Sequence, residues 1–237
     1  TERLSMKAAM GLAMEVQQNF LPHSMPSIPE LDIAARTLYC DETGGDFYDF
    51  IKYSAPKGAR FGIMVGDGSG HGISAALLMA TVRAALRARA AQPGTLAQVI
   101  TDVNRLLGSD TEETGYFMTL FYLEVDVTQK VLRWVRAGHE PAMVIDPESA
   151  SVKKLKGEGM AIGVDAEYIY RENTHPFLKK GQILFIGTDG ISETQNASGE
   201  RFGEERLRNS LKKWSSLPAR EIADRIIEAL DEFRGNN

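Results

Sequence analysis

Three aspartates in this sequence stand beside glycines, each next to a segment that could form a β-strand. Asp46 lies in "GGDFYD", Asp67 in "VGDGSGHG" and Asp189 in "GTDGISE". Glycine lets the backbone approach closely and adopt positive φ, so a main-chain carbonyl could join the carboxylates as a ligand. Carboxylates with few cysteine or histidine partners suit hard divalent cations, Mg²⁺ or Mn²⁺. A single Asp-Gly pair usually forms only a turn. The three together therefore leave two interpretations open, a metal site and a set of turns.

Other chemistries fit this sequence less well. "VGDGSGHG" lacks the glycine spacing of a dinucleotide-binding loop, because the sixth position from Gly66 is His71, and the chain has no Gly-Lys-Ser/Thr. No Ser/His/Asp or Cys/His arrangement is evident. A site with two metal ions needs no nucleophilic side chain, since ions that share a bridging carboxylate can activate water for in-line attack on phosphorus.

Composition places the chain among ordinary globular proteins. It has 237 residues, of which 43% are hydrophobic and 25% charged, which fits one large domain or, less easily, two small ones. The net charge of -5 argues against nucleic acid or an anionic membrane as partner. No apolar run is long enough for a membrane span and no signal peptide is visible. The single cysteine, Cys40, is expected to be a small packing residue near a strand end, and it suits a reducing compartment. We therefore expect a cytoplasmic protein.

Hydrophobic periodicity predicts an order of elements that is not a βαβ alternation. Helices are expected over 2–20, 73–91 and 96–107, and two more close the chain, the last over 218–233. Strands are expected over 31–39, directly after Asp46, and over 60–67, 117–126, 131–138, 142–146, 151–155, 168–176 and 182–190. So many strands in one domain favour an α+β fold with two packed antiparallel sheets covered by helices.

Several blocks of the sequence resemble one family when taken together. "LPHSMPSIPELDIAARTLYCDETGGDFYDF", "GDGSGHGISAALLMATVRAAL", "FMTLFYLEVD", "RAGHEPAMV" and "GTDGISETQNASGERFGEERL" occur in the order seen in bacterial metal-dependent protein serine/threonine phosphatases of type 2C, in the SpoIIE/RsbU subgroup. The resemblance covers roughly residues 17–233. It implies an α-β-β-α sandwich of two antiparallel sheets flanked by helices, preceded by an N-terminal linker helix. It also implies two Mn²⁺ or Mg²⁺ ions and hydrolysis of phosphoserine or phosphothreonine on a partner protein.

The resemblance also assigns roles to individual residues. Asp67 would bridge both metal ions, Asp46 and Asp189 would be further ligands, and Gly68 would offer its backbone carbonyl. The subgroup usually has an aliphatic residue where Gly68 stands, but a carbonyl ligand does not depend on the side chain. These carboxylates, Asp46, Asp67 and Asp189, would be the catalytic residues.

Four other residues of the same motifs have weaker expectations. His71 could transfer a proton or shape the loop through a hydrogen bond, and Ser69 is expected to be a loop-forming hydroxyl rather than a nucleophile. His139 is expected at a turn or sheet end. Glu193 could lie beside the metal ligands or cap a surface helix.

The resemblance further implies partners and boundaries. We expect residues 1–21 to be a linker or signalling helix and 22–237 a phosphatase domain. The chain begins with Thr1 and stops at "DEFRGNN", where the family has an Asp-Asp-x-Thr block, so we expect a fragment that lacks this block, its strand and one metal ligand. The expected substrate is a phosphorylated STAS-domain anti-sigma-factor antagonist. A sensory or receiver domain preceding the helix and a homodimer formed through the helix are also expected.

Two rival functions stay open. The domain could be a catalytically degenerate phosphatase fold that only binds its partner, or a general phosphomonoesterase for small molecules. Turnover on phosphoprotein, free phosphoserine and sugar phosphates would separate the three.

Overall fold

The computed structural model describes residues 11–12, 14–38, 44–53 and 60–235. The chain folds as two compact units. The first consists of Thr1–Ser24, Tyr39–His139 and Gly157–Phe177, and the second of Met25–Leu38, Glu140–Lys156 and Leu178–Asn237. Each unit has its own antiparallel sheet and its own hydrophobic core.

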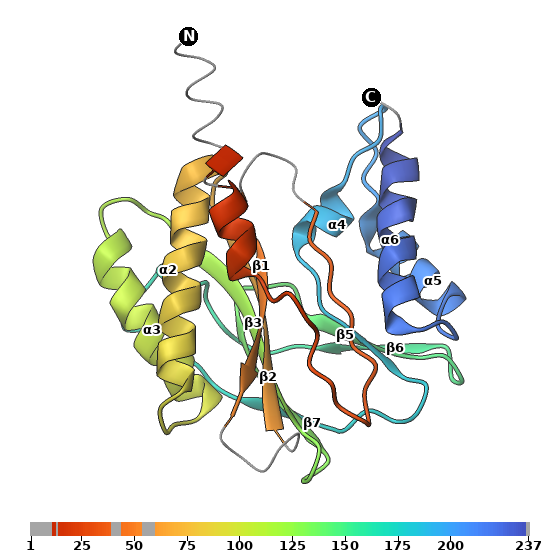
Figure 1. Cartoon of the computed structure of the whole chain (residues 1–237), viewed down its shortest axis with the longest axis horizontal. Helices are drawn as coiled ribbons and strands as arrows, with labels where there is room; N and C mark the ends of the chain where they lie inside the picture. The colour runs from red at the N-terminus through yellow and green to blue at the C-terminus, as the bar shows by residue number, and fades with distance from the viewer. Residues whose placement is uncertain (1–10, 13, 39–43, 54–59, 236–237) are drawn as a thin grey trace. The chain divides into compact units, whose positions relative to one another are not determined.

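The first unit is built on a five-stranded sheet in the order β1-β2-β3-β4-β7 (Figure 1). All neighbouring strands are antiparallel, and β1 is an edge strand. The strands are β1 (Phe47–Lys52), β2 (Arg60–Gly68), β3 (Met118–Asp126), β4 (Val131–Ala137) and β7 (Asn173–Pro176). Residues 11–12 and 14–20 of this unit are helical.

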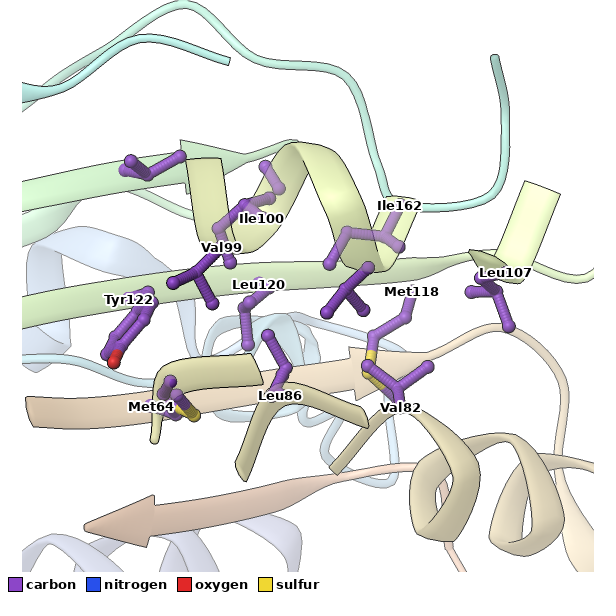
Figure 2. Close-up of a cluster of buried hydrophobic side chains, with 14 of the residues drawn as sticks. Met64, Val82, Leu86, Val99, Ile100, Leu107, Met118, Leu120, Tyr122 and Ile162 are labelled. Carbon is purple, nitrogen blue, oxygen red and sulfur yellow. The ribbon is translucent and has the colours of Figure 1, made fainter. Parts of the chain in front are cut away.

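Two long helices, α2 (Gly72–Ala90) and α3 (Leu96–Thr111), pack against one face of this sheet. A capping box between Thr95 and Gln98 starts α3, because each side chain accepts a hydrogen bond from the other's backbone N–H. The buried faces of α2 and α3 pack against alternate residues of β2 and β3, which point to the same side of the sheet. Figure 2 shows this cluster, which includes Met64, Val82, Leu86, Val99, Ile100, Leu107, Met118, Leu120, Tyr122 and Ile162.

The second unit has a three-stranded sheet in the order β6-β5-β8, with three helices. The strands are β5 (Ala142–Asp146), β6 (Ser151–Leu155) and β8 (Ile183–Phe185), and the helices are α4 (Asp189–Glu193), α5 (Gly203–Lys213) and α6 (Ala219–Arg234). The apolar faces of α5 and α6 bury residues against β5, namely Leu207, Leu211, Ile222, Ile226 and Leu230 with Met143 and Ile145.

The predicted fold class is confirmed: two antiparallel sheets are flanked by helices. The boundaries of α2 and α6 agree with prediction to one residue, and α3 continues to Thr111. None of the described helices is both long and apolar enough to cross a membrane. Cys40 and residues 2–10 and 13 of the helix predicted over 2–20 lie outside the described residues.

Three predicted strands are wrong in whole or in part. Over 31–38 only an isolated bridge between Leu31 and Ile28 forms. This segment is held by side chains instead, since Asp32 accepts a hydrogen bond from the first N–H of α6 at 2.7 Å. The strand predicted over 168–176 reduces to β7, because the backbone N–H of Tyr170 donates to Thr101 of α3 rather than to a strand. The strand predicted over 182–190 ends at Phe185.

Candidate metal centre

Asp46 and Asp67 are brought to one edge of the first sheet by the pairing of β1 with β2. Phe47 pairs with Gly66, and beyond the ladder the N–H of Gly68 donates to the carbonyl of Gly45 at 3.3 Å. The register continued by one residue therefore places Asp46 opposite Asp67. Opposed residues of antiparallel strands project from the same face, so the two carboxylates occupy neighbouring positions on one face of the sheet.

The backbone segments that carry these two aspartates approach each other closely. A Cβ built on Gly45 would lie 2.6 Å from the carbonyl oxygen of Gly68 and 3.0 Å from its Cα. Only glycine at position 45 allows this contact without a backbone shift. Gly45 therefore lies directly against the carbonyl oxygen of Gly68, which the family resemblance predicts as a metal ligand.

The loop after Asp67 is fixed to the start of β3. The N–H of Ser69 donates to the Phe117 carbonyl at 2.8 Å, and the N–H of Phe117 donates to Ser69 Oγ at 3.0 Å. The expectation of a loop-forming hydroxyl at Ser69 is confirmed. Gly70 and Gly72 have φ of 87° and 70°, values that favour glycine and turn the chain into α2.

His71 is the exposed N-cap residue of α2, and its imidazole makes no capping hydrogen bond. Its carbonyl accepts a hydrogen bond from Ser74 Oγ at 3.3 Å. The loop is therefore shaped by Ser69 and by the glycines, and the structure gives no support to a capping role for the His71 ring. Proton transfer by His71 stays a prediction.

The buried His139 is linked to Asp67 through Thr119. Thr119 pairs with Asp67 across β2 and β3, and its hydroxyl is 2.7 Å from His139 Nδ1. His139 follows β4, as expected for a sheet-end residue, but it is only 2% exposed. Arg136 Nη1 donates to the His139 carbonyl at 2.7 Å. Sequence reasoning missed Thr119, because only the β2–β3 register makes it a neighbour of Asp67.

The N-terminal helix holds the turn that carries Asp46. Gln17 is buried, with 4% exposure, and its side-chain amide nitrogen donates to the Gly44 carbonyl. The Gly44 N–H donates in return to Gln17 Oε1 at 3.3 Å. Gln17 therefore fixes the backbone two residues before Asp46 through two hydrogen bonds. Nothing in the sequence pattern marks this glutamine among the other polar residues of the helix.

A buried ion pair fixes the same edge strand to a helix. Asp49 of β1 is 1% exposed and pairs with Arg83 Nε at 3.0 Å and with Arg87 Nη1 at 2.8 Å, both from α2. Burial lowers the pKa of Arg83, and the charge of Asp49 opposes this effect. Asp49 lies three residues after Asp46 in the chain. Its ion pairs attach β1 to α2, whereas the ladder alone would hold this edge strand only to β2.

Asp189 belongs to the second unit and stands in a different local setting. It is an exposed residue in the first turn of α4, not the last residue of a strand as predicted, and its carbonyl accepts from Ser192 Oγ at 3.1 Å. Glu193 ends the same helix and pairs with Arg201 at 2.8 Å. Glu193 therefore takes part in an exposed ion pair, and a place beside the metal ligands stays a prediction.

The donors present fit a hard divalent cation in type. Asp46 and Asp67 offer carboxylates and Gly68 a carbonyl, the oxygen ligands that Mg²⁺ and Mn²⁺ prefer. Among the described residues, however, no three His, Cys, Asp or Glu side chains gather into a metal-binding group. The first unit thus supplies two carboxylates, and the sharing of one centre with Asp189 stays a prediction.

Comparison with known proteins identifies the fold and the family of the chain. The SiaA-PP2C domain of Pseudomonas aeruginosa superimposes with a TM-score of 0.81 at 23% identity, covering 100% of this chain and 94% of that chain. The fold is therefore that of a PP2C domain. The family model described as stage II sporulation protein E (SpoIIE) matches residues 57–237. The chain belongs to the SpoIIE family.

Two relatives carry functional names. Phosphoserine phosphatase RsbU of Bacillus subtilis is 27% identical over 194 residues, which cover 81% of this chain and 56% of RsbU. Phosphoserine phosphatase RsbP of the same organism is 26% identical over 194 residues, which cover 81% of this chain and 47% of RsbP. The chain thus spans about half the length of these relatives.

Proposed function

We propose that this chain is a metal-dependent protein serine/threonine phosphatase domain, which hydrolyses phosphoserine or phosphothreonine on a partner protein. The observation that carries the proposal is the placement of Asp46 opposite Asp67, beside the close approach of Gly45 to Gly68. Membership of the SpoIIE family and similarity to two named phosphoserine phosphatases support the same reaction.

The proposed roles of the chain's own residues are those that the family resemblance implies. Asp67 would bridge two Mn²⁺ or Mg²⁺ ions, with Asp46, Asp189 and the Gly68 carbonyl as further ligands. When bound, such ions lower the pKa of water and neutralise developing charge on the phosphate oxygens. The backbone of Asp67 is fixed by its pairing with Thr119 of β3 before substrate arrives. The Thr119 hydroxyl is hydrogen-bonded to His139, and Gln17 holds the turn that carries Asp46.

The proposed partners are those that the family resemblance implies. The substrate is a phosphorylated STAS-domain protein, and a sensory or receiver domain would precede residues 1–21. These residues would form the linker helix. Leu12, Val16 and Phe20 are 62%, 48% and 40% exposed at helical spacing, which fits pairing with a second copy of the helix. If removal of residues 1–16 changed neither mass in solution nor turnover, the signalling role of this helix would be withdrawn.

The decisive experiment measures phosphate release from a phosphorylated STAS-domain protein with Mn²⁺ and with EDTA. We expect turnover only with metal, and loss of turnover in Asp67→Asn without a change in the thermal melt. Asp231→Asn, an exposed carboxylate on α6, is the matched control and should behave as the parent protein.

Two results would favour a rival. Binding of the phosphoprotein that persists in EDTA, without turnover at any Mn²⁺ concentration, would support the degenerate binding module. Comparable rates on free phosphoserine or sugar phosphates would support a general phosphomonoesterase.

A further inference from the structure

We infer that Tyr116, Phe117 and Val164 form a docking surface for the substrate protein, which contacts apolar residues flanked by lysine or arginine beside the phosphorylated side chain. The inference rests on the proposed function, since it names the substrate surface that the same site would receive. We call these three residues the apolar rim.

The apolar rim is assembled by a short antiparallel contact between two loops. The backbones of Met118 and Ile162 exchange both hydrogen bonds, at 2.9 and 2.8 Å. Beyond this pair the second loop turns, because Gly163 has φ of 94° and the N–H of Val164 donates to a carbonyl three residues earlier at 3.4 Å. A Cβ on Gly163 would lie 3.1 Å from the Tyr116 carbonyl, so Val164 directly follows a residue that lies close to the Tyr116 backbone.

These side chains stay exposed although they are large and apolar. Tyr116 is 37%, Phe117 38% and Val164 54% exposed. Their neighbours Met118 and Ile162 are fully buried in the core. The chain therefore leaves three apolar side chains at the surface directly after placing the adjacent ones inside. Aromatic residues at a surface are typical of interface centres.

The apolar rim is continuous with the candidate metal centre. The Phe117 backbone makes two hydrogen bonds with Ser69, one to its backbone N–H and one to its hydroxyl, and Ser69 follows Gly68 in the loop after Asp67. The Tyr116 ring lies over the same loop, because a Cβ on Gly70 would be 3.7 Å from its Cε1. A phosphorylated side chain that reached Asp67 would bring its flanking residues onto this surface. The occupant is thus the substrate protein itself.

The charge around the apolar rim indicates which flanking residues fit. The two segments that build it, 109–118 and 160–167, contain no lysine or arginine. They contain five carboxylates, all exposed: Asp110, Glu112, Glu113, Asp165 and Glu167. Opposite charges across an interface favour the correct partner and disfavour the wrong one. A substrate with basic residues around an apolar contact is complementary to this surface.

The test uses two synthetic phosphoserine peptides and p-nitrophenyl phosphate with Mn²⁺. One peptide carries leucine and lysine around the phosphoserine, and the other carries serine and glutamate. We expect the protein to prefer the first peptide by about tenfold in kcat/KM, or about 1.4 kcal/mol, mainly through KM. Val164→Lys should abolish the preference, because it removes an apolar contact and repels the lysine of the first peptide. Val164→Ser should reduce the preference, and both variants should still turn over p-nitrophenyl phosphate.

The control is Ile169→Lys, which places the same charge on the same loop at a residue that is 68% exposed. The loop runs back along α3, from Gly163 beside Thr111 to Tyr170 beside Thr101. Ten helical residues separate the two contacts by about 15 Å, so Ile169→Lys should keep the peptide preference.

Each remaining outcome overturns the inference. Equal rates on both peptides, or equal effects of Val164→Lys and Ile169→Lys, would show that the apolar rim does not recognise substrate. A dimer that Val164→Lys converts to monomer, with unchanged peptide preference, would assign the surface to a second copy of the chain. Failure to hydrolyse p-nitrophenyl phosphate and both peptides would overturn the proposed function, and the docking inference with it.

Discussion

Two Asp-Gly sequences in this chain look alike but receive very different structural support. Asp67 lies inside a strand paired on both sides, and its glycine neighbour is in contact with the backbone of Gly45. Asp189 opens a five-residue helix that buries none of its residues. The first aspartate is therefore held by a ladder and a core, and the second by one short turn. The comparison teaches that precise placement comes from neighbouring strands rather than from the Asp-Gly pair itself.

The largest expected effect comes from adding one methyl group to each region. Gly45→Ala would force the Asp46 turn away from Gly68, and we expect turnover to fall on the order of 100-fold, as for a loss of catalytic preorganisation. Gly190→Ala should change turnover little, because its Cβ would meet nothing nearer than Thr188 Oγ1 at 3.9 Å. Phosphate release from p-nitrophenyl phosphate measures both. Equal tolerance of the two substitutions would remove the contrast between the regions.

The next effect concerns metal requirement. We expect Asp67→Asn to lose turnover at every Mn²⁺ concentration. Asp189→Asn should retain turnover at saturating metal, with the half-maximal Mn²⁺ concentration raised about tenfold, as for loss of one of several ligands. A Mn²⁺ titration of activity measures this difference. If both variants were inactive throughout, Asp189 would matter as much as the bridging residue despite its exposed helix turn.

Removing an ion pair should cost more stability in the first unit than in the second. Asp49→Asn leaves Arg83 and Arg87 without their carboxylate at a buried position, which should lower the free energy of unfolding by about 3 kcal/mol. Glu193→Gln removes a pair whose side chains are 50% and 61% exposed, and should cost less than about 0.5 kcal/mol. Urea unfolding followed by circular dichroism compares them. A larger loss in Glu193→Gln would contradict the comparison.

The smallest effect is a pH dependence in the second unit. A hydrogen bond from Gln182, together with backbone N–H groups, lowers the pKa of Asp146. Because the folded pKa lies below the unfolded value of about 3.9, this contribution is present above that value and is lost as pH falls through the folded pKa. The melting temperature of the parent protein should therefore fall more steeply below about pH 4 than that of Asp146→Asn. Parallel slopes would exclude this contribution.

The accuracy of the sequence predictions follows how local each signal is. Apolar periodicity over many residues located α2, α3 and α6, because a helix buries a regular stripe. Short apolar segments separated by turns predicted β3 to β6, because a strand in a sheet buries at least one of its faces. The same signal failed over 31–38, where Asp32 and Arg36 bind residues of α6 instead of a neighbouring strand. A strand needs a partner that its own sequence does not specify.

The candidate site divides in the same way. Asp46, Asp67 and Gly68 were recognisable because carboxylates and glycines at a strand end carry a chemical signal of their own. Thr119 and Gln17 were not, since their importance comes only from hydrogen bonds to residues far away in the chain.

By itself, the sequence determined the fold class, the family and the residue types that could bind a divalent cation, because periodicity and local motifs encode these directly. Only the tertiary structure decided that Asp46 lies opposite Asp67, that the backbones at Gly45 and Gly68 touch, and that Met118 pairs with Ile162. These arrangements depend on strand register, which is set by pairing between distant segments and by the burial of one face.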